Sequence, residues 1–249
     1  MKMEEIEMKL FRKIALFFAA TVMVAFSAER MVLGEYFTNA NWPSCGPAGV
    51  HLEGVQANHL NEYITIGYHM SWPGSDIFYN YNIPQAEARR SYYAVSYVPQ
   101  IHFNGTTFGG SGYSAWENMI SNLTGNNAPI SIDLGGGYDW GSRQGFLDVD
   151  ITSESGVEGE YRLYVVLIEN DLYYPTSTHP GLHPKVMRSM LTGSTGQVVT
   201  LAPNNNESFQ VNFDIPEIVV VENAQIVVFV QNHGTKEVLN ASVTTIEAI

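Results

Sequence analysis

The spacing of the apolar residues changes near residue 127, and this change limits the folds open to the chain. Before it, segments with helical spacing alternate with short runs of β-branched and aromatic residues. After the segment Gly125-Asn126-Asn127-Ala128-Pro129, every apolar run has the composition of a strand, and Gly, Asn, Pro and Ser residues separate the runs. The sequence therefore predicts an α/β domain over residues 29–125 and an all-β domain over residues 126–249.

The first domain alternates strands and helices in a definite order. Its strand-like runs are MVLGEYF, YITIGYHM, VPQIHF and TTFGG. Its helical segments are Pro47–Leu60, Gln85–Tyr93 and Tyr113–Leu123. Along the chain these segments give the order β-α-β-α-β-β-α, which is that of the thioredoxin fold, an α/β layer structure.

The second domain consists of strand-like runs without helices between them. The runs are PISIDL, GFLDVDIT, EYRLYVVLIEN, GQVVTL, ESFQVNFDI and AQIVVFVQN. Strands of this length at regular spacing, separated by turn residues, predict an Ig-like antiparallel β-sandwich.

The N-terminus has the features of an export signal. Residues 14–28 form an apolar run behind a basic segment; the run is shorter than the about 20 residues of a membrane span but suits a signal-peptide core. We predict a signal peptide over residues 1–28, with the true start at Met8 and cleavage after Ser27 or Ala28. An N-terminal membrane anchor is the alternative. The mature protein is then expected in the periplasm, at the outer membrane or outside the cell, without further membrane insertion.

Two segments of the first domain and three of the second resemble a known family. The first two, GEYFTNANWPSCGPAG and YYAVSYVPQIHFNG, are similar to the active-site turn and the cis-proline segment of thioredoxin-like proteins. The other three are RLYVVLIEND, HPKVMRSMLTG and IVVFVQNHGTKEVLNAS. Together they resemble the twenty-eight-kilodalton outer-membrane-protein family, exported thioredoxin-like proteins of Gram-negative bacteria. The resemblance covers most of residues 31–245 and implies a protein of the cell envelope.

Cys45 is the only cysteine of the chain, so the protein cannot form an internal disulfide. In a Cys-x-x-Cys turn the first thiol is activated at a helix N-terminus and the second resolves the mixed disulfide. Counting from Phe37 places Trp42 at the first position and Cys45 at the second, and we favour this register because it keeps the family's spacing. Alternatively, Cys45-Gly46-Pro47-Ala48 aligns with Cys-Gly-Pro-Cys after three extra residues, which would make Cys45 a nucleophile without a resolving partner.

Pro99 occupies the position of the cis-proline in this resemblance. Such a proline offers backbone groups to an extended peptide, and this kind of docking does not need thiols. Gln100 replaces the threonine that commonly follows it. We therefore expect Trp42, Cys45, Val98 and Pro99 to form a binding pocket, with a purely structural turn at Pro99 as the alternative.

No other group of residues indicates a second site as clearly as the residues around Cys45 and Pro99 indicate the first. The formal charge of −13 disfavours nucleic acid as a partner. His179 and His183 cannot share a helix because two prolines and a glycine lie around them, so we expect no metal site even with Glu169 or Asp171 nearby. The tyrosines of the first domain are expected to be core residues, with a sugar- or peptide-binding surface as the alternative.

These observations predict an exported protein that has lost dithiol redox activity and acts as a binding or structural module of the envelope. We expect no cofactor, and a protein or peptide is the kind of partner that the pocket would accept. The alternative function is a monothiol disulfide oxidoreductase that uses Cys45 together with an external thiol.

Overall fold

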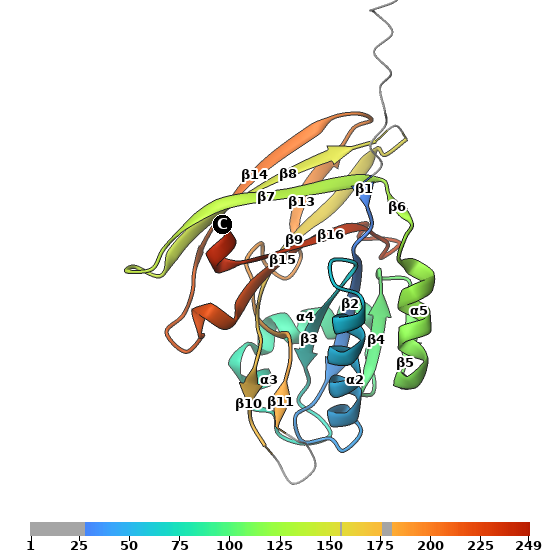
Figure 1. The fold of residues 1–249 in the computed structure, drawn as a ribbon, viewed down its shortest axis with the longest axis vertical. Coiled ribbons are helices and arrows are strands. Elements are labelled where there is room, and N and C mark those ends of the chain that lie inside the picture. The colour runs from blue at the N-terminus through green and yellow to red at the C-terminus, as the bar shows by residue number, and fades with distance from the viewer. Residues whose placement is uncertain (1–27, 155, 176–180) are drawn as a thin grey trace, which may run out of the picture.

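The computed structural model describes residues 28–249 with the exception of residue 155 and residues 176–180 (Figure 1). The predicted signal peptide therefore lies outside the described residues, apart from Ala28. None of the described helices has the length and apolar character needed to cross a membrane.

The first part of the chain forms a four-stranded segment of sheet flanked by helices. Its elements are β2 (Val32–Thr38), α2 (Cys45–Asn58), β3 (Tyr63–His69), α3 (Ile77–Tyr81), α4 (Ile83–Tyr93), β4 (Gln100–Phe103), β5 (Thr107–Gly110) and α5 (Trp116–Leu123). β2 and β3 are parallel, β4 runs antiparallel to β2, and β5 runs antiparallel to β4. The strand order is thus β3-β2-β4-β5. Only the short α3 was not predicted.

Both faces of this sheet are covered, which is why every residue of β2 and β3 is buried. Val32 and Tyr36 of β2 pack with residues of α2 and α5, whereas Leu33 and Phe37 pack with residues of α4. This alternation is the two-residue period of a strand. α2 presents Ala48, Leu52 and Val55 to the sheet at helical spacing.

The second part contains two antiparallel layers. Its elements are β7 (Ile130–Asp139), β8 (Gln144–Ser153), β9 (Gly159–Glu169), β10 (Leu172–Tyr173), β11 (Leu182–His183), β12 (Val186–Met190), β13 (Gln197–Leu201), β14 (Asn206–Asp214), β15 (Ala224–Gln231) and β16 (Val238–Thr245). One layer has the order β14-β8-β7, and the other contains β13, β9, β15 and β16. Leu147, Val149 and Ile151 alternate along β8 and share one core with Val165 and Val228 of the opposite layer.

One sheet runs through both parts of the chain, because β12 connects them. β12 pairs with β9 in antiparallel fashion, and at its start Val186 pairs with Gly67 of β3 in parallel fashion. The full order is β16-β15-β9-β12-β3-β2-β4-β5, with β13 also paired to β9. Gly67 permits this approach, since a Cβ there would lie 3.2 Å from the Lys185 carbonyl oxygen. Neither β12 nor β16 was predicted as a strand, because both carry polar residues among their apolar ones.

A buried ion pair also joins the two parts. Arg89 of α4 donates to both carboxylate oxygens of Glu35 on β2, with an Nε to Oε2 distance of 2.9 Å, and to the amide oxygen of Gln231 on β15 at 3.1 Å. The Tyr93 hydroxyl donates to Glu35 at 2.6 Å and receives a hydrogen bond from Gln231 at 2.9 Å. The Arg89 guanidinium also lies over aromatic rings, including that of Tyr164 at 4.8 Å. Glu35, Arg89 and Gln231 are almost completely buried.

Two short pairings complete the fold. β1 (Ala28–Glu29) pairs with β6 (Asn127–Ala128), so the first described residues lie beside the segment where the pattern of elements changes. β10 and β11 form a narrow arm that reaches from the second part to the vicinity of α2 and α3 (Figure 1).

Candidate functional site

Cys45 is the first residue of α2, and its side chain is fully buried. Its backbone N–H donates to the Trp42 carbonyl oxygen at 3.0 Å, and its carbonyl oxygen accepts from the Tyr36 hydroxyl at 3.1 Å. Burial raises the pKa of the thiol to about 11, although hydrogen bonds from Thr38 and from the Asn39 backbone act in the opposite direction. A helix N-terminus favours a thiolate, but here the loss of hydration outweighs it. At neutral pH the group is a thiol.

The residue at which α2 begins can be compared with the two possible registers of the Cys-x-x-Cys turn. α2 begins at Cys45 and not at Trp42, which lies in the preceding turn. The position of Cys45 at the helix start is the one that the Cys-Gly-Pro-Ala register expects.

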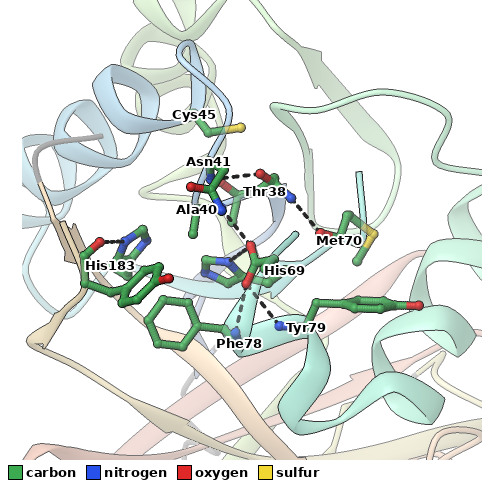
Figure 2. Close-up of polar contacts among 12 residues, drawn as sticks. Thr38, Ala40, Asn41, Cys45, His69, Met70, Phe78, Tyr79 and His183 are labelled. Carbon is green, nitrogen blue, oxygen red and sulfur yellow. Dashed lines mark hydrogen bonds and ion pairs between the residues drawn. The ribbon is translucent and has the colours of Figure 1, made fainter. Parts of the chain in front are cut away.

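A buried polar cluster holds that loop in place (Figure 2). Asn39 donates from Nδ2 to the carbonyl oxygens of Met70 and Gly74, both at 2.8 Å, and its Oδ1 accepts from the Asn41 N–H at 2.8 Å. Asp76 accepts from the Ala40 N–H at 2.7 Å. The Asn39 side chain and the Ala40 N–H thus attach the loop to the segment that follows β3.

Asp76 is the central acceptor of this cluster. Its carboxylate caps α3 by accepting from the N–H groups of Phe78 at 2.8 Å and Tyr79 at 3.1 Å. It also lies 2.7 Å from Nδ1 of His69, the last residue of β3. Burial by itself would raise the pKa of Asp76, but His69 and the backbone donors outweigh it and hold the pKa below its ordinary value.

The rings of His69, Phe78 and His183 contact one another, with 5.5 Å between the two histidine ring centroids. The His69 ring centroid is 4.8 Å from that of Phe78, and the His183 centroid is 4.9 Å from it. His183 Nε2 is 3.1 Å from the Tyr174 carbonyl oxygen within the β10–β11 arm, and the contacts of the His183 ring with Phe78 and His69 attach the arm to this cluster. A histidine oriented by a buried carboxylate is the arrangement of a catalytic base. Figure 2 shows the Cys45 sulfur on the side of Thr38, with Ala40 and Asn41 between it and His69, so the geometry provides no thiol–imidazole pair.

The predicted binding residues divide into a buried group and an exposed one. Val98 and Pro99 are buried, Val98 belongs to the same apolar cluster as Cys45, and the peptide bond between Val98 and Pro99 is cis, as predicted. The Trp42 side chain is 40% exposed and lies on the loop ahead of Cys45. Thus Cys45 and Val98 are buried in the same apolar cluster, while the Trp42 side chain is partly exposed.

Sequence reasoning missed Asn39 and Asp76, the two residues that attach the loop. The signal for Asp76 was present, since an aspartate directly before the apolar segment IFY is a helix N-cap pattern. Asn39 had no comparable signal, because its partners Met70 and Gly74 are about 30 residues away in the sequence.

The candidate metal ligands do not converge among the described residues. No group of three or more His, Cys, Asp or Glu side chains within the described part of the chain could hold a metal ion. Glu169 accepts from Arg188 Nε at 2.7 Å and from the Val220 N–H at 2.8 Å. His179 lies outside the described residues.

A family model for the outer membrane protein Omp28 matches residues 86–248. The chain belongs to the Omp28 family. The match begins in α4 and covers the strands of the β-rich second part, and it confirms the predicted family. It does not include the segment around Cys45. Membership in a family of outer membrane proteins is consistent with an exported, envelope-associated protein.

Two solved structures share this fold at low sequence identity. HBP35 of Porphyromonas gingivalis superposes with a TM-score of 0.73 and 15% identity, covering 89% of this Omp28-family chain and 76% of its own. A crystal structure of a protein from Agrobacterium tumefaciens gives a TM-score of 0.55 with 13% identity, covering 88% and 96%. A domain of the outer membrane lipoprotein Omp28 from Porphyromonas gingivalis covers 48% of this chain and 88% of its own, with 20% identity and a TM-score of 0.36. No curated protein matches the sequence.

Proposed function

We propose that this Omp28-family protein is a non-catalytic binding or structural module of the cell envelope. The observation that carries the proposal is the state of Cys45: it is the only cysteine, its side chain is fully buried, and its thiol has a pKa of about 11. Dithiol exchange requires two thiols, one of them an accessible thiolate. A protein with neither cannot reduce or form disulfides by itself.

The α/β part would be a thioredoxin-like domain with a degenerate Cys-x-x-Cys turn, and the second part an Ig-like sandwich. The strand order β3-β2-β4-β5 and the helix that starts at Cys45 support the first assignment. The two antiparallel layers with a common core support the second. In this proposal the protein is secreted by a signal peptide and remains at the outer membrane or in the periplasm.

The proposed contact surface for a protein or peptide partner is the loop before Cys45. Trp42 is a large exposed ring on a loop whose backbone is fixed by Asn39 and Asp76. A fixed backbone lowers the entropy lost on binding, and Trp is frequent among the residues that dominate interfaces. In this proposal the backbone at Val98 and Pro99 would contribute to the same surface.

Insulin reduction by dithiothreitol tests the absence of redox activity. The mature protein and its Cys45→Ala variant should both leave the rate of insulin precipitation at the level of the reductant alone. A rate that is higher for the wild-type protein than for Cys45→Ala would contradict the proposal. A thioredoxin at the same concentration serves as the positive control.

The second candidate is a monothiol oxidoreductase, and the position of Cys45 at the start of α2 favours it. In this function Cys45 would form a mixed disulfide with an external thiol, which would then release it. The function requires the loop to open, because the thiol is fully buried in the described structure. The two candidates therefore differ in whether native Cys45 reacts with a small thiol reagent.

A further inference from the structure

A hollow of about 680 Å³ lies at the end of the β14-β8-β7 sheet, far along the chain from Cys45. Its lining residues come from β7, from β8 with the turn before it, and from the end of β14. The volume lies within the range typical of small-molecule sites. In Figure 1 the β7–β8 hairpin extends beyond the rest of the sheet at this end.

The register of the three strands shows which side chains share the solvent face of the sheet. Gly137, Phe146 and Asn212 lie in one row across the strands. The other face of β8 carries Leu147, which is buried in the core. Phe146 is 38% exposed, although it is an apolar residue on an outer face.

Glycine on β7 allows the Phe146 ring to approach the neighbouring strand closely. A Cβ at Gly137 would lie 3.0 Å from the Phe146 ring. Since β7 has no side chain at this row, the Phe146 ring packs against the strand at Gly137 and keeps 38% of its surface exposed. A partly exposed aromatic ring offers a surface against which the C–H face of a pyranose ring can pack.

Polar side chains surround this ring. The next row toward the hairpin turn consists of Asp139, Gln144 and Asp214, and all three are exposed. Asn212 lies beside Phe146 in the same row. Carboxylates accept hydrogen bonds from neighbouring hydroxyls, and amides both donate and accept.

The hairpin turn that carries Asp139 is attached to the loop after β14. Arg143 donates from Nε to the Ile215 carbonyl oxygen at 2.9 Å and from Nη2 to those of Pro216 and Val219, at 2.9 and 2.7 Å. The Gly141 N–H donates to Asp139 Oδ1 at 2.8 Å, which fixes one oxygen of that carboxylate. Arg143 therefore donates its hydrogen bonds to backbone carbonyls. The charged side chains at the rim of the hollow include the carboxylates of Asp139 and Asp214.

We propose that this hollow binds a neutral saccharide, with one sugar ring stacked on Phe146 and its hydroxyls bonded to Asp139, Gln144, Asn212 and Asp214. The two carboxylates repel uronic acids and other anionic sugars, which excludes that class of ligand. Stacking supplies the apolar contribution and the amides and carboxylates fix the orientation, as in other small-ligand sites. The surface is separate from the Cys45 loop, so the inference does not depend on the proposed function.

Saturation-transfer NMR and calorimetry on the mature protein test this site. The probes are maltotriose, cellotriose, mannotriose and diacetylchitobiose, with trigalacturonate as the anionic and acetylcholine as the cationic comparison. We expect at least one neutral probe to bind and Phe146→Ala to weaken it about tenfold or more. Asp214→Asn should weaken it as well, while Cys45→Ala should leave it unchanged.

Two matched variants separate the site from general effects on the fold. Phe108→Ala removes another exposed phenylalanine, on β5, and Asp133→Asn removes another exposed carboxylate, on β7; both should bind like the wild type. Thermal melts of all variants check that the fold is retained. The inference is overturned if no neutral probe binds at about 20 mM, where a Kd near 1 mM would still fill the site. Binding that Phe146→Ala leaves unchanged, or binding of acetylcholine alone, overturns it too.

Discussion

Cys45 combines a favourable position for reactivity with an unfavourable environment. At the start of a helix its thiolate gains from the helix dipole, typically by less than about 1 kcal/mol at an exposed site. Burial destabilises the thiolate by more than the dipole stabilises it, and the pKa of the thiol therefore rises to about 11. The same side chain in an exposed turn would be a nucleophile, so the packing around it decides its chemistry.

Native Cys45 should be alkylated slowly, because its thiol is buried and its pKa is raised. With a pKa of about 11, about one thiol in a thousand is ionised at pH 8. Iodoacetamide labelling followed by mass spectrometry should therefore be slow from pH 6 to about pH 8 and should become fast in guanidinium chloride. Cys45→Ala gives the unlabelled background. Fast labelling of the native protein below pH 8 would instead favour the monothiol oxidoreductase.

His102 is predicted to reduce stability in mild acid. Burial, with smaller effects of Lys236 and Arg89, lowers its pKa from 6.5 to about 4, against the attraction of Glu35. Between these values the unfolded chain binds a proton that the folded chain does not, so stability falls as the pH drops from about 6.5 to 4. After allowance for partial exposure the loss is about 2 kcal/mol.

His102→Gln removes the imidazole, so the unfolded chain no longer binds this extra proton. Urea unfolding at a series of pH values measures the change in the pH dependence of stability. The variant should lose about 2 kcal/mol less than the wild-type protein between pH 6.5 and 4. His233→Gln, which replaces a histidine outside the β-sheets, is the comparison. Equal pH dependence of wild type and His102→Gln would contradict the assignment.

At the scale of elements, short segments depend on side chains from outside themselves. α3 is too short to be stable alone, and Asp76 provides its N-cap. The same carboxylate holds Ala40 in the loop before α2. The Asp76 carboxylate thus contacts β3, α3 and the loop before α2. The sequence pattern indicated only its role as a helix cap.

Asp76→Ala should destabilise the protein by about 3 kcal/mol or more, because it leaves buried N–H groups without their acceptor. The contribution of Asp76 also depends on pH. Its folded pKa is lowered, so the stabilisation is present above the unfolded pKa and is lost as the pH falls through the folded pKa. Urea unfolding at pH 7 measures the loss, and Asp133→Asn on the exposed face of β7 should change stability by less than about 0.5 kcal/mol. A loss of similar size for both variants would argue against the central role of Asp76.

At the scale of the whole molecule, β12 and the Glu35–Arg89 pair join the two parts. β12 inserts between β9 and β3, so the α/β part and the β-rich part share one sheet. Arg89 bridges β2 and β15 through Glu35 and Gln231. Burial alone would lower the pKa of Arg89, but Glu35 raises it above its ordinary value, so the guanidinium remains charged inside the protein.

Removing both partners of this pair should cost less than the sum of the two single removals. Glu35→Gln leaves a buried guanidinium without its counter-ion and should destabilise the protein by about 3–5 kcal/mol. Arg89→Met should destabilise the protein by a similar amount. The double variant should lose at least about 2 kcal/mol less free energy of unfolding than the sum of the losses of the two single variants. Denaturant unfolding of the four proteins gives this coupling. Glu160→Gln, from the exposed pair with Arg162, should change stability by less than about 0.5 kcal/mol; additive losses at Glu35 and Arg89 would refute the coupling.

The sequence predicted most elements of the fold and part of the candidate site. The main helices and the long strands follow from local spacing of apolar residues, and the cis peptide bond before Pro99 was anticipated from a resemblance to a known family. β12 was missed because its middle residue is Arg188, whose charge is neutralised only by the distant Glu169. Asn39 was missed for the same kind of reason, since its partners follow the next strand.

The sequence by itself determined that this protein has no internal disulfide and that its first part is α/β and its second part all-β in pattern, because composition and periodicity are local properties. Only the tertiary structure decided that Cys45 is a buried thiol, that one sheet unites the two parts, and that Phe146 packs against the strand at Gly137. Each of these depends on which distant segments pack together, and hydration, charge and access are set by that packing.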